Sequence, residues 1–175
     1  MKRAAFPPAD LLVRPHELWS RRWLLLAAGS LEKNDFNAMT VGWGSFGTMW
    51  NKPFAQIVVR PTRHTFAFLE KYPTFTLSAF TEEQRPALQL MGSRSGRDCD
   101  KIAESGLHVE PSAKVDAPSF TEAELVIECR TIYRADFDPA AFGDLSIDRN
   151  YPKKDYHRSY FGEIVAASAV PRHYR

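Results

Sequence analysis

Short apolar runs separated by turn-forming residues recur along the chain, and they predict strands more often than helices. Residues 23–29 form a continuous apolar run, Asn34-Asp35 marks a turn, and residues 37–41 follow it, so this region predicts a hairpin. Further strands are expected where β-branched residues cluster or apolar residues alternate with polar ones. These strands are residues 54–60, 75–80, 124–133 and 160–166.

Alternation is clearest in residues 124–133. Leu125, Ile127, Cys129 and Tyr133 are predicted to share one face, because side chains alternate across a strand. We expect this face to pack into the core, with charged residues on the opposite face.

Short helices are expected between the strands. Their predicted ranges are residues 65–72, 82–91 and 98–105. Pro86 disfavours the interior of the second helix, and Gly106 suits the residue that follows the third. Residues 42–51, rich in Gly and Trp, are predicted to be a loop, and residues 134–156 give no prediction.

This order of elements predicts an α+β fold, mainly antiparallel, in which the strands form a closed or partly closed barrel. The length of 175 residues predicts a single domain over residues 1–175. Hydrophobic residues make up 44% of the chain, which excludes a disordered protein.

Charge and apolar run length exclude two classes of partner. Lys and Arg number 23 against 21 Asp and Glu, a formal net charge of +2, so no nucleic-acid partner is expected. The longest apolar run, Trp23 to Gly29, is far shorter than the roughly 20 residues that span a bilayer, so no membrane association is expected. Cys99 and Cys129 form no disulfide framework, which favours a cytoplasmic location.

Two basic turns are candidate anion sites. Residues 60–65 read Arg-Pro-Thr-Arg-His-Thr at a strand end that leads into a helix. Residues 93–101 combine hydroxyls, a glycine and two arginines before the next helix. The simpler interpretation is a pair of helix starts with solvated arginines, the second capped by Asp98.

Other catalytic patterns are absent from the sequence. The five histidines lack metal-ligand spacing, so no metal site is predicted. Residues 42–47 match G-x-G-x-x-G, but a proline and a strand follow where a dinucleotide-binding helix would start. Trp43, Phe46 and Trp50 fit a ring-stacking surface, a core or an interface.

The order of several short motifs resembles the flavin reductase-like family, in the flavoredoxin-type branch of the FMN-binding split barrels. The motifs are Asn37-Ala-Met-Thr-x-x-Trp-Gly44, Lys52-Pro53, Val59-Arg-Pro-x-Arg63-x-Thr65, Ser95-Gly-Arg-Asp-x-Asp-Lys101, Glu122-Ala-Glu-Leu with Glu128-Cys129, and His157-x-x-Tyr160-x-Gly162-Glu-Ile164. Together they span roughly residues 20–166.

The resemblance implies a split barrel that binds FMN non-covalently as a homodimer, with the flavin near the subunit interface. It implies that the isoalloxazine and ribityl chain are lined by Asn37, Met39, Thr40, Trp43 and Ser45. It places near the phosphate Arg60, Arg63 and Thr65, together with Ser95, Gly96 and Lys101, and leaves open which turn holds it. His157 is the catalytic candidate, beside the ring or the nicotinamide.

Three functions follow from these observations. The first is an oxidoreductase that passes electrons from NADH, NADPH or a protein donor through FMN to a small-molecule or protein acceptor. The second is a flavoredoxin-like electron carrier that binds FMN but has no NAD(P)H activity of its own. The third is an anion-binding module that uses the same barrel without a flavin.

Overall fold

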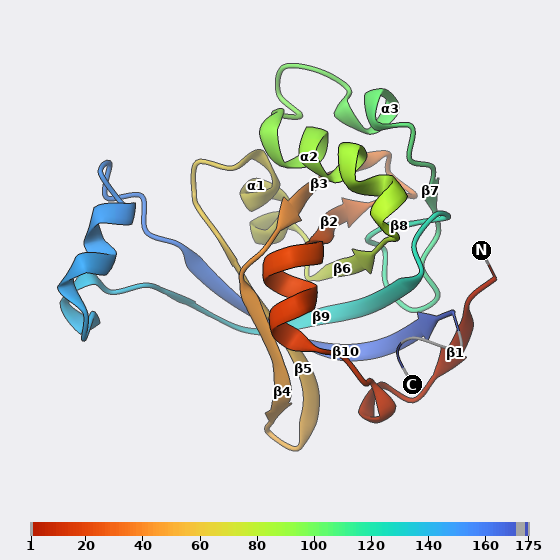
Figure 1. Ribbon diagram of the computed structural model, residues 1–175, viewed down its shortest axis with the longest axis horizontal. Helices are drawn as coiled ribbons and strands as arrows, with labels where there is room; N and C mark the ends of the chain where they lie inside the picture. The colour runs from red at the N-terminus through yellow and green to blue at the C-terminus, as the bar shows by residue number, and fades with distance from the viewer. Residues whose placement is uncertain (1, 171–173, 175) are drawn as a thin grey trace.

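The computed structural model describes residues 2–170 and Tyr174, and Figure 1 shows an antiparallel sheet with helices gathered at one end of it. The strands are β1 (Ala4–Phe6), β2 (Leu24–Ser30), β3 (Asp35–Val41), β4 (Gly44–Met49), β5 (Lys52–Val59), β6 (Thr74–Ala79), β7 (Val109–Glu110), β8 (Ser119–Phe120), β9 (Leu125–Asp136) and β10 (Arg158–Ala169). The α-helices are α1 (His64–Lys71), α2 (Arg85–Ser93) and α3 (Lys101–Ser105). Short π- or 3-10-helical turns occur at Pro8–Asp10, Glu17–Arg22, Glu82–Gln84, Pro139–Ala141 and Leu145–Asn150.

The main sheet runs in the order β3-β2-β6-β9-β10-β5-β4, and β1 pairs with the C-terminal end of β10. Every neighbouring pair is antiparallel. Within residues 2–170, the two ends of this order, β3 and β4, are not hydrogen-bonded to each other. The predicted α+β, mainly antiparallel fold is therefore confirmed, and the sheet curves without closing.

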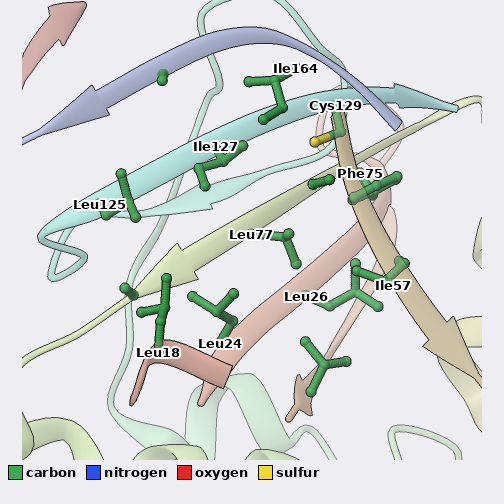
Figure 2. Close-up of a cluster of buried hydrophobic side chains, with 14 of the residues drawn as sticks. Leu18, Leu24, Leu26, Ile57, Phe75, Leu77, Leu125, Ile127, Cys129 and Ile164 are labelled. Carbon is green, nitrogen blue, oxygen red and sulfur yellow. The ribbon is translucent and has the colours of Figure 1, made fainter. Parts of the chain in front are cut away.

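Burial on both faces explains the continuous apolar run of β2. Leu24 and Leu26 join the main core, where Figure 2 shows them near Leu77. Leu25 points the other way, into a second apolar cluster with Met91 of α2. Because neither face of β2 meets water, its sequence shows no polar alternation.

A long excursion between β9 and β10 stands off the sheet, at the left of Figure 1. We call residues 137–157 the arm. The sequence pattern predicts no element for most of this segment, which consists of two short 3-10 turns and connecting loops. Its base returns to the sheet at His157, directly before β10.

The predicted loop at residues 42–51 is wrong, because residues 44–49 form β4 and pair with β5. Trp50 and Asn51 close this hairpin with φ values of 53° and 58°, as a tight turn of two left-handed residues requires. A Cβ at Gly44 would lie 2.5 Å from the Trp19 ring. Gly44 therefore provides space for the Trp19 ring, and it does not mark a flexible loop.

The face predicted for Tyr133 is also wrong. Leu125, Ile127 and Cys129 lie in the core as expected, but Tyr133 is 48% exposed. The register skips Ile132 between the pairs Gly162–Thr131 and Phe161–Tyr133. This bulge reverses the alternation and turns Tyr133 to the outer face.

The predicted helices are present with shifted starts. The second begins as a 3-10 turn, and Pro86 lies in the first turn of α2, where its missing N–H has no partner to lose. The third begins at Lys101, because Asp100, not Asp98, accepts the capping hydrogen bond from the Ala103 amide. Gly106, at φ 72°, ends it as predicted.

No helix within residues 2–170 is both long enough and apolar enough to cross a membrane.

Candidate functional site

Two adjoining pockets lie along β3 and the turn from β5 into α1. The histidine pocket, of about 250 Å³, is lined by Met39, Thr40, Val41, Gly42, Trp43, Val58, Val59, Arg60, Arg63 and His157. The basic pocket, of about 280 Å³, is lined by Asn37, Met39, Thr62, Arg63, His64, Thr65, Met91, Gly92, Ser93, Arg94, Ser95, Arg97, Asp98 and Lys101. Because Met39 and Arg63 line both pockets, the two form one connected site.

The basic pocket joins the two basic turns that the sequence identified separately. Arg97 of the second turn donates to the carbonyl of Thr62 in the first, with Nη1 and O 3.2 Å apart. Asn37 of β3 donates from Nδ2 to Thr65 Oγ1 over 2.8 Å, and both residues are buried. Residues 62–65 of the first turn and most of residues 93–101 therefore line one pocket, so the two turns need not be alternative anion sites.

Gly96 allows this junction. A Cβ at this position would lie 2.4 Å from Asn37 Oδ1 and 3.3 Å from the His64 ring. Any side chain there would push the second turn away from β3 and α1. Gly96 lines a further hollow that continues from the basic pocket past Asn37 and Lys101.

Lys101 supplies a buried positive charge. Its residue is only 3% exposed, and Nζ donates to the carbonyls of Met91 and Arg94 over 3.0 and 3.2 Å. An ammonium group has three donors, so one remains for a ligand. Burial, together with the nearby Arg63 guanidinium, lowers the pKa of Lys101 to about 8.

The charges around Lys101 favour an anion. Within the described residues Arg63 makes no ion pair, so its guanidinium is available at the junction of the two pockets. Burial and the charges of Arg97 and Lys101 lower the pKa of His64, as expected in a positive field. α1 starts in this pocket without a side-chain cap, which leaves its first amides for a ligand.

The histidine pocket contains an uncharged imidazole. His157 is 9% exposed, and its Nδ1 lies 2.8 Å from the hydroxyl of Tyr151 in the arm. Burial and the charge of Arg60 lower the pKa of His157 to about 4. The Trp43 ring lies 5.2 Å from the imidazole, so the pocket has a flat aromatic edge beside a polar one.

Arg60 connects the sheet to the arm. Its guanidinium pairs with Asp155 at 3.1 Å, donates to the carbonyl of Asn150 and lies 5.0 Å from the centre of the Tyr151 ring. Arg60 lines the histidine pocket but not the basic pocket. Of these two arginines, Arg63 therefore lines the basic pocket beside the second basic turn, and Arg60 does not.

Ser45 is the one named residue that lies outside these hollows. Its hydroxyl donates to Gln56 Oε1 over 2.8 Å, and Gln56 in turn donates to Ser159. The other ten residues that the resemblance places beside the flavin, and His157, line the connected hollows. Within residues 2–170, no cluster of three or more His, Cys, Asp or Glu could hold a metal.

The sequence did not identify the arm's contribution to this site. Tyr151 and Asp155 reach His157 and Arg60 through a turn of the chain that no local periodicity marks. The available signal was compositional, because Phe142, Tyr151 and Tyr156 stand in an otherwise polar segment and their rings contact one another.

Comparisons with a family model and with solved structures both identify flavin reductase-like proteins. The model of the flavin reductase like domain matches residues 23–174. An FMN-binding domain of a flavin reductases-like enzyme from Shewanella baltica superposes with a TM-score of 0.71 at 19% identity, covering 99% of this chain and 83% of that one.

Two further structures share the fold. Flavoredoxin from Methanosarcina acetivorans has a TM-score of 0.67 at 23% identity, covering 86% of this chain and 69% of that one. An NADH:FAD oxidoreductase from Streptomyces globisporus has a TM-score of 0.63 at 17% identity, covering 85% and 75%. At these identities the likeness establishes the fold alone.

Anion binding should depend on the protonation of Lys101. Between about pH 7.5 and about pH 9 the Lys101 ammonium, with its pKa of about 8, loses its charge, so affinity for inorganic phosphate should fall roughly three- to tenfold. The shift in melting temperature with phosphate concentration measures this. Lys101→Gln keeps donors for the two carbonyls without the charge, and should bind phosphate weakly at both pH values. If the affinity of Lys101→Gln for phosphate fell between the two pH values as much as that of the wild type, the assignment of the pH dependence to Lys101 would be contradicted.

Proposed function

The chain belongs to the flavin reductase-like family, and from that premise we propose that it binds FMN non-covalently and passes electrons from NADH or NADPH through it to an acceptor. The observation that carries this proposal is the connected site, in which a basic pocket continues into a pocket with an aromatic edge and a neutral donor. FMN has the matching form, with a phosphate at one end and a flat ring at the other.

The basic pocket suits the phosphate. Arg63, Lys101 and the first amides of α1 converge there, and charge-assisted bonds to phosphate are stronger than neutral ones. Thr65 and Ser95 add hydroxyls. Both basic turns therefore contribute to holding the phosphate in this proposal, with Gly96 keeping the second turn close to the first.

The histidine pocket suits the ring system. Met39 and Trp43 give it apolar surface, and Thr40 lies beside them, whereas Asn37 lines the adjoining basic pocket and the further hollow. When bound, FMN supplies the hydride-accepting and electron-releasing chemistry that protein side chains lack. The residues of the chain bind it, orient it and offer hydrogen bonds to its polar edge, His157 among them.

A second candidate function is an electron carrier. The flavoredoxin from Methanosarcina acetivorans shares the fold, and Trp43, at the edge of the histidine pocket, is 54% exposed. In a carrier, the exposed edge would meet a protein donor instead of a nicotinamide. The NADH:FAD oxidoreductase of the same fold supports the enzyme, so turnover must distinguish the two.

A cytoplasmic location belongs to the same proposal. Cys99 and Cys129 are free thiols, and Cys129 is fully buried on the core face of β9. Free thiols are typical of a reducing compartment.

We also propose that the protein functions as a homodimer through the outer face of β4, β9 and β10. Ring contacts link Trp50 to Tyr133 at 6.0 Å and Tyr133 to Phe161 at 5.7 Å, and the two outermost rings are about half exposed. Leu145, in the arm that connects β9 to β10, is 80% exposed. A second copy would cover these rings, as aromatic residues are favoured at interfaces.

After the purified protein is mixed with FMN and the unbound FMN is removed, the protein should be yellow. With the flavin bound, it should oxidise NADH or NADPH. Visible absorption followed by a nicotinamide assay measures both properties. A yellow protein without turnover would favour the electron carrier, whereas a colourless protein with no affinity for FMN would contradict both functions and leave the anion-binding module.

The dimer should depend on the aromatic outer face. Trp50→Lys places a charge among the rings and should shift the protein towards monomer, as seen by sedimentation velocity. Leu12→Lys is the matched control, since Leu12 is 68% exposed and lines a separate hollow to which β4, β9 and β10 contribute no residue. A wild-type protein that sediments as a monomer, or an unchanged Trp50→Lys dimer, would contradict this interface.

A further inference from the structure

The arm brings a second titratable side chain to the imidazole of the histidine pocket. Tyr151 is 1% exposed, and its hydroxyl lies 2.8 Å from His157 Nδ1. The two rings meet edge to face, 5.5 Å apart. The backbone of the imidazole residue is fixed as well, because its carbonyl accepts from the Phe137 amide at the other side of the arm's base.

The direction of this hydrogen bond follows from the surroundings of the hydroxyl. Burial raises the pKa of Tyr151, so the phenol keeps its proton. Within the described residues, Nδ1 is the one hydrogen-bond partner of this hydroxyl. If Nδ1 donated instead, the phenolic proton would lie buried without an acceptor, which proteins avoid. Tyr151 therefore donates and Nδ1 accepts.

We propose that Tyr151 is a positioning residue that fixes His157 in the tautomer with a bare Nδ1 and a protonated Nε2, so that His157 serves the site as an uncharged hydrogen-bond donor. Nε2 makes no hydrogen bond with any described residue, although the imidazole lines the pocket. Its N–H is thus free for an electronegative ligand atom, such as a carbonyl oxygen or a ring nitrogen.

Burial, and after it the charged groups around the imidazole, keep the imidazole neutral. Arg60 lies at the pocket wall and over the Tyr151 ring, and Arg63 lies at the junction with the basic pocket. Asp155 favours the protonated imidazole, but it is already paired with Arg60. Because the pKa of His157 is about 4, the side chain has no proton to release as an acid near neutral pH.

This assignment changes the role expected for His157. A histidine beside a redox site is usually taken as a proton donor, because its ordinary pKa lies near neutrality. Here the hydrogen bond from Tyr151 favours the neutral imidazole, and a hydrogen bond to a neutral form opposes ionisation. The ligand to which Nε2 donates rests on the proposed function, whereas the tautomer does not.

The tautomer is measured on the flavin-free, ¹⁵N-labelled full chain by correlating the imidazole nitrogens with the ring protons. At neutral pH, His157 should show an unprotonated Nδ1 and a protonated Nε2. A protonated Nδ1 would overturn the proposal.

Tyr151→Phe separates the hydrogen bond from packing, because phenylalanine fills the same buried space. Loss of one donated hydrogen bond should raise the titration midpoint of His157 by roughly half to one pH unit above its wild-type value. Tyr156→Phe is the matched control: Tyr156 belongs to the same arm and contacts the Tyr151 ring, but its hydroxyl bonds to Asp148. An unchanged midpoint in Tyr151→Phe, or an equal rise in both variants, would overturn the proposal.

The ligand is tested with FMN itself. In Tyr151→Phe, affinity for FMN should fall about two- to tenfold, the value of one weakened neutral hydrogen bond. If the nitrogen resonances and the midpoint behave as expected but neither protein binds FMN, the proposed function fails and the positioning role of Tyr151 stands. If FMN binds and the midpoint does not move, the positioning role fails alone.

Discussion

The close approach of Gly96 to Asn37 is the contact on which the candidate site depends. At that point the backbone of the second basic turn lies against a buried side chain of β3, with no room for a Cβ. Asn37 in turn holds Thr65 at the start of α1. One steric constraint therefore joins two segments that are about 30 residues apart in the sequence, and it places Arg63 and Lys101 in one pocket.

Collecting positive charge in this way opposes folding unless an anion relieves it. Among the described residues, Lys101 has only backbone carbonyls as hydrogen-bond partners, and its lowered pKa reflects the cost of burying that charge. A ligand phosphate offsets both the burial and the repulsion from Arg63. The geometry thus agrees with the proposal that a phosphate-bearing cofactor completes the protein. In that proposal the local charges of the basic pocket, rather than the small net charge of the chain, recognise the dianion.

Local patterns predicted most of the longer helices and strands, but not the contacts between them. The apolar run of β2, the basic turns and the ordered motifs were sufficient for the fold class and for most residues that line the candidate pockets, because each depends on a few neighbours in sequence. Tyr133 was misplaced because a single extra residue, Ile132, reverses the strand's faces. The β4 strand was missed because Gly44 accommodates Trp19 and Gly47 lies against Phe54, contacts that no local pattern reveals. The contribution of Tyr151 depends on where a long arm returns to the sheet, which composition alone does not specify.

The central claim is that the basic pocket recognises the flavin phosphate. The most direct test compares FMN with riboflavin, which carries the same ring and ribityl chain without the phosphate. Titration of the apoprotein, followed by flavin fluorescence, should show FMN binding at least about 100-fold more tightly, since two or more charge-assisted hydrogen bonds depend on the phosphate. Affinities for the two flavins within about threefold of each other would contradict the account, because the converging charges would then have no role in binding.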